Sequence, residues 1–312
     1  MAEREPSAQQ FTLDDALGID TPAPFMDLEV PEYAYMFGFL QADGHLSQQS
    51  RDRGRLTVEI NVRDIKILHE FQRLTPYNST IRERTRATNF SESHHSAIWT
   101  LCSLEARTTV NQLGLPYGRK SKKITPPRVE FSRRDYLRGV IDADGAVGYT
   151  GQGLPFVSLT TASTAVGVYL CRYTRMLTGA ERIIRRNARD GIYNIVYTKE
   201  AAMGLAADLY YPGCLALERK QTAAASLGAW VRPADMKIAP ERRRWKQWED
   251  RVLLQQDNPT SAAEALGRTV QSCSLRLWRL RSGKVPMPAN DQRGTEDGPG
   301  LLPAGARPHF SP

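Results

Sequence analysis

The chain has 312 residues, of which 41% are hydrophobic and 24% are charged, and its formal net charge is +8. This composition is ordinary for a soluble protein, and the length leaves room for two or three domains. The sequence contains no apolar run long enough to span a bilayer and no secretory signal pattern. Its four cysteines lie far apart without metal-ligand spacing, so we expect reduced core residues in an intracellular protein with no membrane partner.

The charge is distributed unevenly along the chain. Residues 1–29 hold seven acidic residues and one basic residue, a balance of −6, so the remaining residues carry +14. Because residues 1–29 are polar, Pro-interrupted and without periodicity, we interpret them as a disordered acidic arm. The excess of positive charge in the rest of the chain favours a polyanionic partner, although a basic ribosomal or lipid-surface protein would have similar charge.

The first half of the body, residues 30–127, is predicted to be a mixed unit of helices and antiparallel strands. An apolar helix opens it, and an alternating strand with Leu56, Val58, Ile60 and Val62 on one side comes next. In order, the predicted elements are a helix at Pro31–Asp43, a strand at 55–63, a helix at 64–75, strands at 80–86 and 97–104, and a helix at 105–113. A loop that contains Lys120 ends this half.

The outward faces of two of these strands are rich in side chains that can bind nucleic acid. They comprise Arg55, Thr57, Glu59, Asn61 and Arg63 on one strand, and Arg82, Arg84 and Arg86 on another. Arginine binds guanine and asparagine binds adenine through two hydrogen bonds, and a β-ribbon fits the major groove of DNA. We therefore interpret these residues as DNA-facing. The alternative is an ordinary amphipathic strand with a solvated face.

The second half, residues 128–228, repeats the same order of elements. They are a helix at 133–144, a Gly-rich hairpin, a strand at 156–161, a helix at 164–177, strands at 182–187 and 192–198, and a helix at 201–209. We assign Arg185 and Asn187, at the end of the strand predicted at 182–187, to a DNA-facing set as well. The order predicts an α+β fold of two pseudo-symmetric αββαββα repeats rather than an alternating parallel α/β fold.

Two chemical landmarks recur at nearly one spacing. Asp43 and Asp144 are 101 positions apart, and Lys120 and Lys220 are 100 positions apart. An acid and a lysine that recur at one period indicate two copies of one unit, each of which supplies the same chemical pair.

Each of the two acids ends an apolar helix that carries a strip of small residues. The strips are Gly38 with Ala42, and Gly139 with Ala143. Because residues four apart share one helix face, two such strips allow two helix backbones to approach closely. We therefore predict that these four residues form a helix–helix interface.

Both helices then end in Asp-Gly, with the glycine suited to the left-handed position past the last turn. A carboxylate at the negative end of a helix dipole is disfavoured by roughly 0.3–1 kcal/mol, so an acid there in both copies calls for a compensating cation. A divalent metal shared between the two helix ends is the obvious candidate. For either copy alone, the alternative is a simple turn from helix to strand.

With these features, residues 30–228 resemble the LAGLIDADG homing endonucleases. The segment Leu137–Gly145 matches the nine-residue motif of that family at all positions except Arg138 and Val140, and Met36–Gly44 matches it more loosely. The resemblance implies that the two motif helices pack against each other above a saddle of strands that binds DNA. It also implies that both DNA strands are cut across the minor groove, which leaves short 3′ overhangs.

The same resemblance implies roles for individual residues. Asp43 and Asp144 would hold Mg²⁺ or Mn²⁺, and Lys120 and Lys220 would help to activate the attacking water. The first copy departs from the motif at Gln41, where the second copy has Asp142. Positions two apart on a helix point to nearly opposite sides, so Asp142 cannot face a metal together with Asp144. The loss of this acid in the first copy should therefore spare the chemistry.

A different pattern follows a Pro-containing linker at residues 229–240. Residues 241–284 resemble a Myb/SANT-type three-helix module with a helix-turn-helix, through an opening Trp with an acid pair, an Ala-rich second helix, and the spacing of Cys273, Leu277 and Leu280. This segment holds ten basic and five acidic residues. We expect it to bind DNA, and the alternative is a protein-binding SANT domain. The assigned DNA-binding residues are Arg268, Gln271, Arg276 and Arg279. Residues 285–312 are predicted to be a disordered Pro/Gly-rich tail.

Taken together, these features predict a site-specific endonuclease that hydrolyses phosphodiester bonds of double-stranded DNA and is cytoplasmic or nucleoid-associated. Because the two halves differ, one monomer could read a long asymmetric target site. Two other classes stay open: an RNA maturase or non-cleaving DNA-binding regulator on the same scaffold, and a nucleic-acid-binding module in which the motif helices are purely structural.

Overall fold

The chain divides into two units, Met1–Pro233 and Ala234–Pro312. The computed structural model describes residues 23–50, 53–88, 91–236 and 244–288. Most of the predicted acidic arm and tail, and part of the predicted linker, therefore lie outside the described residues. Within those ranges, no helix is both long and apolar enough to cross a membrane.

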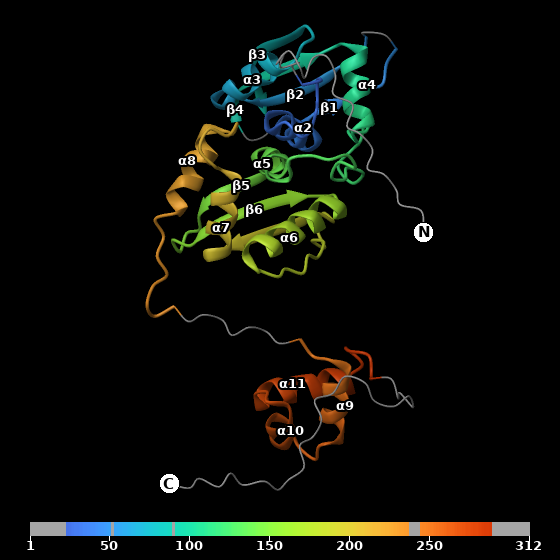
Figure 1. The fold of residues 1–312 in the computed structure, drawn as a ribbon, viewed down its shortest axis with the longest axis vertical. Helices are drawn as coiled ribbons and strands as arrows, with labels where there is room; N and C mark the ends of the chain where they lie inside the picture. Colours follow the sequence, from blue (N-terminus) through green and yellow to red (C-terminus); the bar gives the residue numbers. More distant parts are fainter. Residues whose placement is uncertain (1–22, 51–52, 89–90, 237–243, 289–312) are drawn as a thin grey trace, which may run out of the picture. The chain divides into compact units, whose positions relative to one another are not determined.

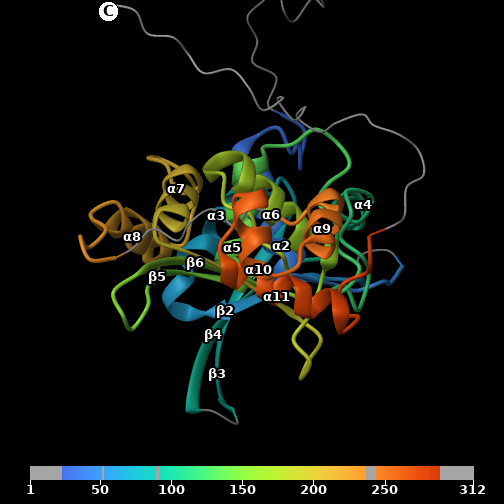
Figure 2. The same ribbon diagram turned by 90° about the horizontal axis from the view of Figure 1, so that it is seen from below.

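The first repeat follows the predicted αββαββα order. Its four strands form an antiparallel sheet with the order β1-β2-β4-β3, and α2, α3 and α4 accompany it. The elements are α2 (Pro31–Asp43), β1 (His45–Leu46), β2 (Leu56–Asn61), the 3-10 helix η2 (Val62–Asp64), α3 (Lys66–Leu74), β3 (Ser79–Thr88), β4 (Ser91–Leu101) and α4 (Leu104–Gln112). In Figure 2 the β3–β4 hairpin extends away from the body of this unit.

The second repeat has a smaller antiparallel sheet with the order β5-β6-β7. Its elements are α5 (Arg133–Asp144), β5 (Gly145–Tyr149), β6 (Pro155–Thr161), α6 (Thr164–Thr178), β7 (Tyr193–Thr198), α7 (Glu200–Leu209) and α8 (Glu218–Leu227). The α+β class is confirmed, since both sheets are antiparallel and the helices pack beside them.

The predicted strand at 182–187 is wrong. This segment makes only an isolated bridge between Arg186 and Tyr193. Its sequence places two isoleucines and then two arginines side by side, so it lacks the alternation that a half-buried strand needs. Ile183 is accordingly 77% exposed. Helix α8, which sequence reasoning did not predict, follows the last loop of the repeat instead.

The motif helices α2 and α5 lie side by side at the centre of the first unit, with the strands of one repeat on each side (Figure 1). They approach each other at the two predicted glycines. A Cβ atom on Gly38 would lie 2.2 Å from the carbonyl oxygen of Tyr136, and one on Gly139 would lie 2.1 Å from that of Tyr35. Real Cβ atoms do not approach backbone so closely, so only glycine permits this crossing. Ala42 and Ala143 are half-buried one turn further along.

The last residues of the segment that we predicted to be a disordered acidic arm, residues 1–29, are folded. Met26 and Leu28 are 3% and 2% exposed and belong to the hydrophobic core. The carbonyl of Leu28 also accepts a hydrogen bond from the backbone N–H of Ser132 at 2.8 Å. The apolar side chains in this short stretch therefore attach it to the folded unit, despite its acidic composition.

The second unit contains three helices, α9 (Gln247–Gln255), α10 (Pro259–Leu266) and α11 (Val270–Arg281). Side-chain caps begin two of them: Asn258 accepts hydrogen bonds at the start of α10, and Thr269 accepts one at the start of α11. Gly267 has a φ of 58°, a left-handed conformation that ends α10 without strain. A small core holds the helices together and includes Leu253, Ala262, Ala263, Leu266, Cys273 and Leu280.

Candidate active site

Asp43 and Asp144 are the last residues of α2 and α5. Strand β1 begins one residue after Gly44, whereas β5 begins at Gly145 itself. Gly44 has a φ of −67° and Gly145 a φ of −118°, so neither adopts the expected left-handed conformation. The glycines are instead required by close packing. A Cβ on Gly145 would lie 2.4 Å from the carbonyl oxygen of Ser158, and one on Gly44 would lie 2.5 Å from that of Leu40.

The two carboxylates influence each other electrostatically. Partial burial and, to a smaller extent, the negative charge of Asp43 raise the pKa of Asp144 to about 6, against the opposing effect of Lys120 and Lys220. Burial also raises the pKa of Asp43, again opposed by the two lysines. Both residues remain exposed to solvent. The charged form of both acids is therefore disfavoured in the folded protein, and both lie where a cation from solvent can reach them.

The lysines bind the C-terminal ends of the motif helices. The ammonium of Lys220, which is 3% exposed, donates to the carbonyl oxygens of Ile141, Asp142 and Gly145 at 2.7, 2.7 and 2.8 Å. Lys120 donates to the carbonyls of Gln41, at 2.6 Å, and Ala42. The last carbonyls of a helix lack partners within the helix, and its dipole favours a cation there. We expected a metal ion to compensate the aspartate at the negative end of each helix dipole. The two lysines already supply part of this positive charge.

The two lysines are not equivalent as hydrogen-bond donors. An ammonium group has three N–H bonds, and Lys220 uses all three on backbone carbonyls, whereas Lys120 uses two. Burial lowers the pKa of each lysine to about 8, although nearby carboxylates favour the charged form. Lys120 therefore retains one N–H for another acceptor. Lys220 has none left, and its role is to hold the C-terminal end of α5 in place.

Asp142 points away from the helix ends, as predicted. It is 1% exposed and accepts hydrogen bonds from the hydroxyls of Tyr35 and Tyr210, both at 2.7 Å, and from the backbone N–H of Leu217 at 2.8 Å. The first copy has the matching arrangement: Tyr136 donates to Gln41, whose amide donates to two backbone carbonyls. In each copy, a tyrosine of the opposite motif helix therefore fixes the side chain at position 142 or 41.

The position of Arg138, one of the two departures from the nine-residue motif, has a structural explanation. Its guanidinium is fully buried, pairs with Asp135 at 2.5 Å, and donates to the carbonyls of Leu209 and Leu215, both at 2.8 Å. Arg138 therefore ties α5 to the segment that leads to Lys220. Sequence reasoning treated this arginine only as a mismatch.

The polar strand face of the first repeat gathers most of its predicted DNA-facing residues. The strand register places Glu59 and Arg82 on either side of Ile98, and Asn61 and Arg84 on either side of Ser96. Within this face, Glu59 binds Arg84 at 2.7 Å and Arg86 at 3.2 Å. Burial opposes ionisation of Glu59, but hydrogen bonds from Arg84 and Ser96 hold the pKa of this carboxyl below its usual value. Arg55 lies exposed just before β2, with Thr57 in line with the face.

The corresponding residues of the second repeat differ from our assignment. Arg185 is exposed in an irregular segment, and the side chain of Asn187 accepts a hydrogen bond from the backbone of Arg189 within a turn. The polar face of β6 and β7 instead carries Ser158, Thr160, Asn194 and Thr198. Sequence reasoning missed these residues, although the alternation of β6, with Val157 and Leu159 inward, gives the signal.

Of the four residues in the second unit that we assigned to DNA binding, two arginines form ion pairs within the unit. Arg268 binds Glu249 at 2.8 Å, and Arg276 binds Asp250 at 2.6 Å. Both guanidiniums also lie near the ring of Trp245, at 4.1 and 5.7 Å from its centroid. They hold the three helices together. Gln271 and Arg279 are exposed on α11.

Comparison with models of protein families finds no match, and neither does comparison with curated protein sequences. Several solved structures resemble the chain, and those with a family in their descriptions are homing endonucleases. The homing endonuclease I-WcaI bound to its DNA recognition sequence gives a TM-score of 0.43 at 14% identity, over 67% of this chain and 96% of that one. The LAGLIDADG homing endonuclease I-GzeII in complex with a DNA target gives 0.40 at 11% identity, over 62% and 88%. Variants of the homing endonuclease I-DmoI give 0.43 at 13% identity, over 64% and 100%.

The unequal lysine contacts predict unequal effects on stability. We expect Lys220→Met to lower the free energy of unfolding more than Lys120→Met, because it leaves three carbonyls without their donor rather than two. Each buried acceptor left unsatisfied costs about 1–3 kcal/mol. Urea unfolding measures the difference, with Lys122→Met, an exposed lysine near Lys120, as the control. Equal losses for the two variants would contradict the assigned difference.

Proposed function

We propose that the protein is a site-specific endonuclease that hydrolyses phosphodiester bonds of double-stranded DNA. The observation that carries the proposal is the pair Asp43 and Asp144 at the ends of two crossed helices, each with a pKa above its usual value. The sequence motif on both helices and the arginine-rich strand face of the first repeat support it. A chain with two unlike halves can read an asymmetric target as a monomer.

The chemistry of this pair fits magnesium or manganese. Among the described residues, no group of three or more His, Cys, Asp and Glu could hold a metal ion, whereas structural and catalytic zinc sites need at least three protein ligands. Mg²⁺ is commonly bound by one or two carboxylates together with substrate phosphates and water. When bound between Asp43 and Asp144, such an ion would neutralise charge on the attacking and leaving oxygens of the phosphodiester.

The surrounding residues would orient the reacting groups. Lys120 has an N–H available for the attacking water or a phosphate oxygen, and Lys220 would keep the α5 end, and thus Asp144, in position. The polar face of β2, β3 and β4 would approach base edges in the major groove. Glu59 keeps Arg84 and Arg86 ordered before DNA binds, which lowers the entropy lost on binding.

We predict that Asp43→Asn or Asp144→Asn lowers the cleavage rate by about 100-fold or more while duplex binding is retained, since each removes a carboxylate ligand but leaves the strand face intact. The substrate is a duplex that the full chain selects from a randomised pool in Ca²⁺, and cleavage is then started with Mg²⁺. Asp142→Asn is the matched control, because its side chain faces Tyr35, Tyr210 and Leu217 rather than the helix ends.

In the same assay, Lys120→Met should lower the single-turnover rate of cleavage more than the affinity for the duplex.

Other outcomes of this assay identify the alternatives. Tight duplex binding without cleavage by the wild-type protein would indicate a non-cleaving DNA-binding regulator. Selection of structured RNA in preference to duplex DNA would indicate a maturase. Undiminished cleavage by both Asn variants would show that the two carboxylates do not hold the metal.

We further propose that the second unit is a Myb/SANT-like DNA-binding module. Its three helices and basic composition support the proposal, with Gln271 and Arg279 on the exposed face of α11 as the side chains directed at DNA. Because Arg268 and Arg276 are held in ion pairs, we assign them a structural role.

Removing this module should weaken binding without abolishing cleavage. A chain that ends at Pro233 keeps all of the first unit, including the ion pair of Arg232 with Glu200. We expect it to bind the selected target more weakly and with a shallower dependence on salt, since fewer phosphates are contacted. Footprinting should show protection lost on one flank only. If affinity, salt dependence and footprint all match those of the full chain, the module does not bind DNA, and a protein-binding role replaces this proposal.

A further inference from the structure

A hollow of about 240 Å³ lies beside Asp43. Asp43 and Ala143 contribute to it from the ends of the motif helices, and Arg63 and Arg219 contribute guanidinium groups. The other polar residues of its lining are Glu59, Asn61, Asp64 and Asp142. The hollow therefore places one of the two candidate metal ligands next to a wall with guanidinium groups. Because four acidic residues and two arginines line it, this hollow is suited to a phosphate that binds together with a divalent cation, the arginines holding phosphate oxygens through paired N–H groups.

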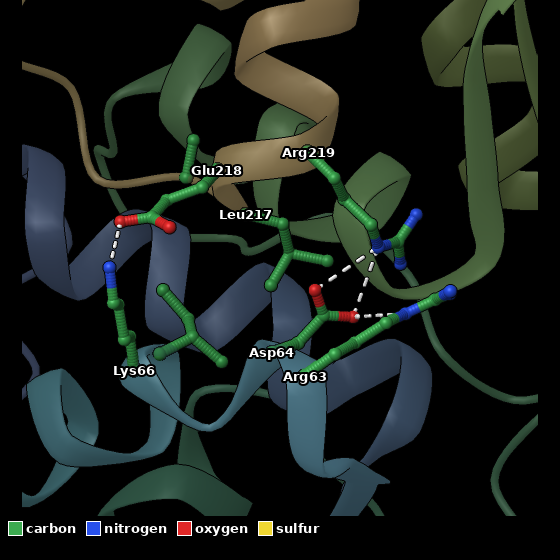
Figure 3. Close-up of a pocket in the computed structure, with 8 residues that line it drawn as sticks. Arg63, Asp64, Lys66, Leu217, Glu218 and Arg219 are labelled. Atoms are coloured by element: carbon green, nitrogen blue, oxygen red, sulfur yellow. Dashed lines mark hydrogen bonds and ion pairs between the residues drawn. The ribbon is translucent and has the colours of Figure 1, made fainter.

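A shared carboxylate holds the two arginines. The Nε of Arg219 lies 3.1 and 3.0 Å from the two oxygens of Asp64, and the Nε of Arg63 lies 3.7 Å from one of them. The Asp64 side chain is only 10% exposed, whereas those of Arg63 and Arg219 are 65% and 42% exposed. Figure 3 shows both guanidiniums converging on this carboxylate, with their terminal nitrogens directed away from it. The group thus carries a net positive charge and presents two ordered sets of N–H donors.

This arrangement joins the two repeats on one side of the helix pair. Asp64 and Lys66 belong to the first repeat, and Glu218 and Arg219 begin helix α8 of the second. Lys66 binds Glu218 at 2.6 Å, next to the contact of Arg219 with Asp64 (Figure 3). Both links are partly exposed, so their main effect is to fix the geometry of the site rather than to stabilise the fold.

The other half of the protein lacks this arrangement. Arg219, next to Lys220, corresponds to Arg119, next to Lys120. By the 101-residue spacing of Asp43 and Asp144, which the strand pairing also follows, Arg63 corresponds to Thr164 and Asp64 to Ala165. The hydroxyl of Thr164 lies within hydrogen-bond distance of Tyr193, at 3.0 Å, and of Arg186, at 3.1 Å, and Ala165 has no carboxylate that could hold an arginine. Arg119 is exposed, and no carboxylate among the described residues pairs with it. The surroundings of Asp43 and Asp144 therefore differ by one arginine and by the acid that orders it.

We propose that Arg63 and Arg219, held by Asp64, bind the scissile phosphate of one DNA strand beside Asp43, so that the protein cuts this strand first and nicked DNA accumulates. The proposal rests on the proposed endonuclease function. In the reaction, a water oxygen forms a new bond to phosphorus and loses a proton to solvent. One bridging P–O bond breaks, and the leaving oxygen takes up a proton. Two guanidiniums would stabilise the extra negative charge that develops on the phosphate oxygens of this strand alone.

The test is a strand-resolved cleavage assay with the full chain. A supercoiled plasmid carrying the selected target is cut in Mg²⁺, and end labels report the rate of cleavage of each strand separately. We expect the wild-type protein to cut one strand faster and to accumulate nicked circles. Arg63→Gln and Arg219→Gln should each slow that strand on the order of 10- to 100-fold and leave the rate of cleavage of the other strand nearly unchanged. Arg119→Gln, the counterpart of Arg219→Gln by the repeat period, should leave the order of cutting unchanged.

Two features separate this role from a loss of folding. Arg63→Gln keeps the contact between Asp64 and Arg219, so its unfolding midpoint should match the wild type. Arg219→Lys keeps the charge but not the paired donors, so it should restore only part of the rate. Equal slowing of both strands by either Gln variant, or equal strand rates in the wild type, would overturn this inference and leave the endonuclease assignment standing. Absence of cleavage by the wild type would overturn both.

Discussion

The close crossing of α2 and α5 is the constraint on which the rest of the first unit depends. At Gly38 and Gly139, the backbone of one helix occupies the space that a side chain of the other would fill, with virtual Cβ distances of 2.2 and 2.1 Å. This contact fixes where both helices end and therefore brings Asp43 and Asp144 within electrostatic reach of each other. Larger residues at the crossing would separate the helices and with them the two carboxylates.

The helix ends are held by charges that oppose each other. Each C-terminus bears an aspartate that the helix dipole disfavours and a lysine that it favours. The lysines bind backbone carbonyls, while the carboxylates stay open to solvent. Tyr35 of α2 donates a hydrogen bond to Asp142 of α5, and Tyr136 of α5 donates one to Gln41 of α2. The site therefore keeps its geometry before any ligand binds, and the remaining electrostatic cost falls on the two acids that would receive the cation.

The sequence predicted the parts of this structure that follow from short-range patterns. The motif helices, the glycines between them and the direction of the Asp142 side chain away from the helix ends all depend on helical periodicity, and the structure shows each of them. Errors occurred where tertiary contacts decide the outcome. The pairing of Arg268 and Arg276 with acids and the link of Asp64 to Arg219 join residues that are 19 to 155 positions apart, and no local pattern signals them.

We propose that the two carboxylates form one centre that is strained until a metal binds, and thermal unfolding of the full chain tests this directly. The pKa of Asp144 is raised from 3.8 to about 6, so its contribution to folding stability is present below the lower value and is lost as the pH rises through the higher one. Asp144→Asn should therefore melt at a higher temperature than the wild type at pH 7.5 in EDTA, and this advantage should disappear by about pH 4. Mg²⁺ should raise the midpoint of the wild type and have little effect on the variant. An Asn variant no more stable than the wild type at pH 7.5, together with equal stabilisation of both by Mg²⁺, would contradict the account.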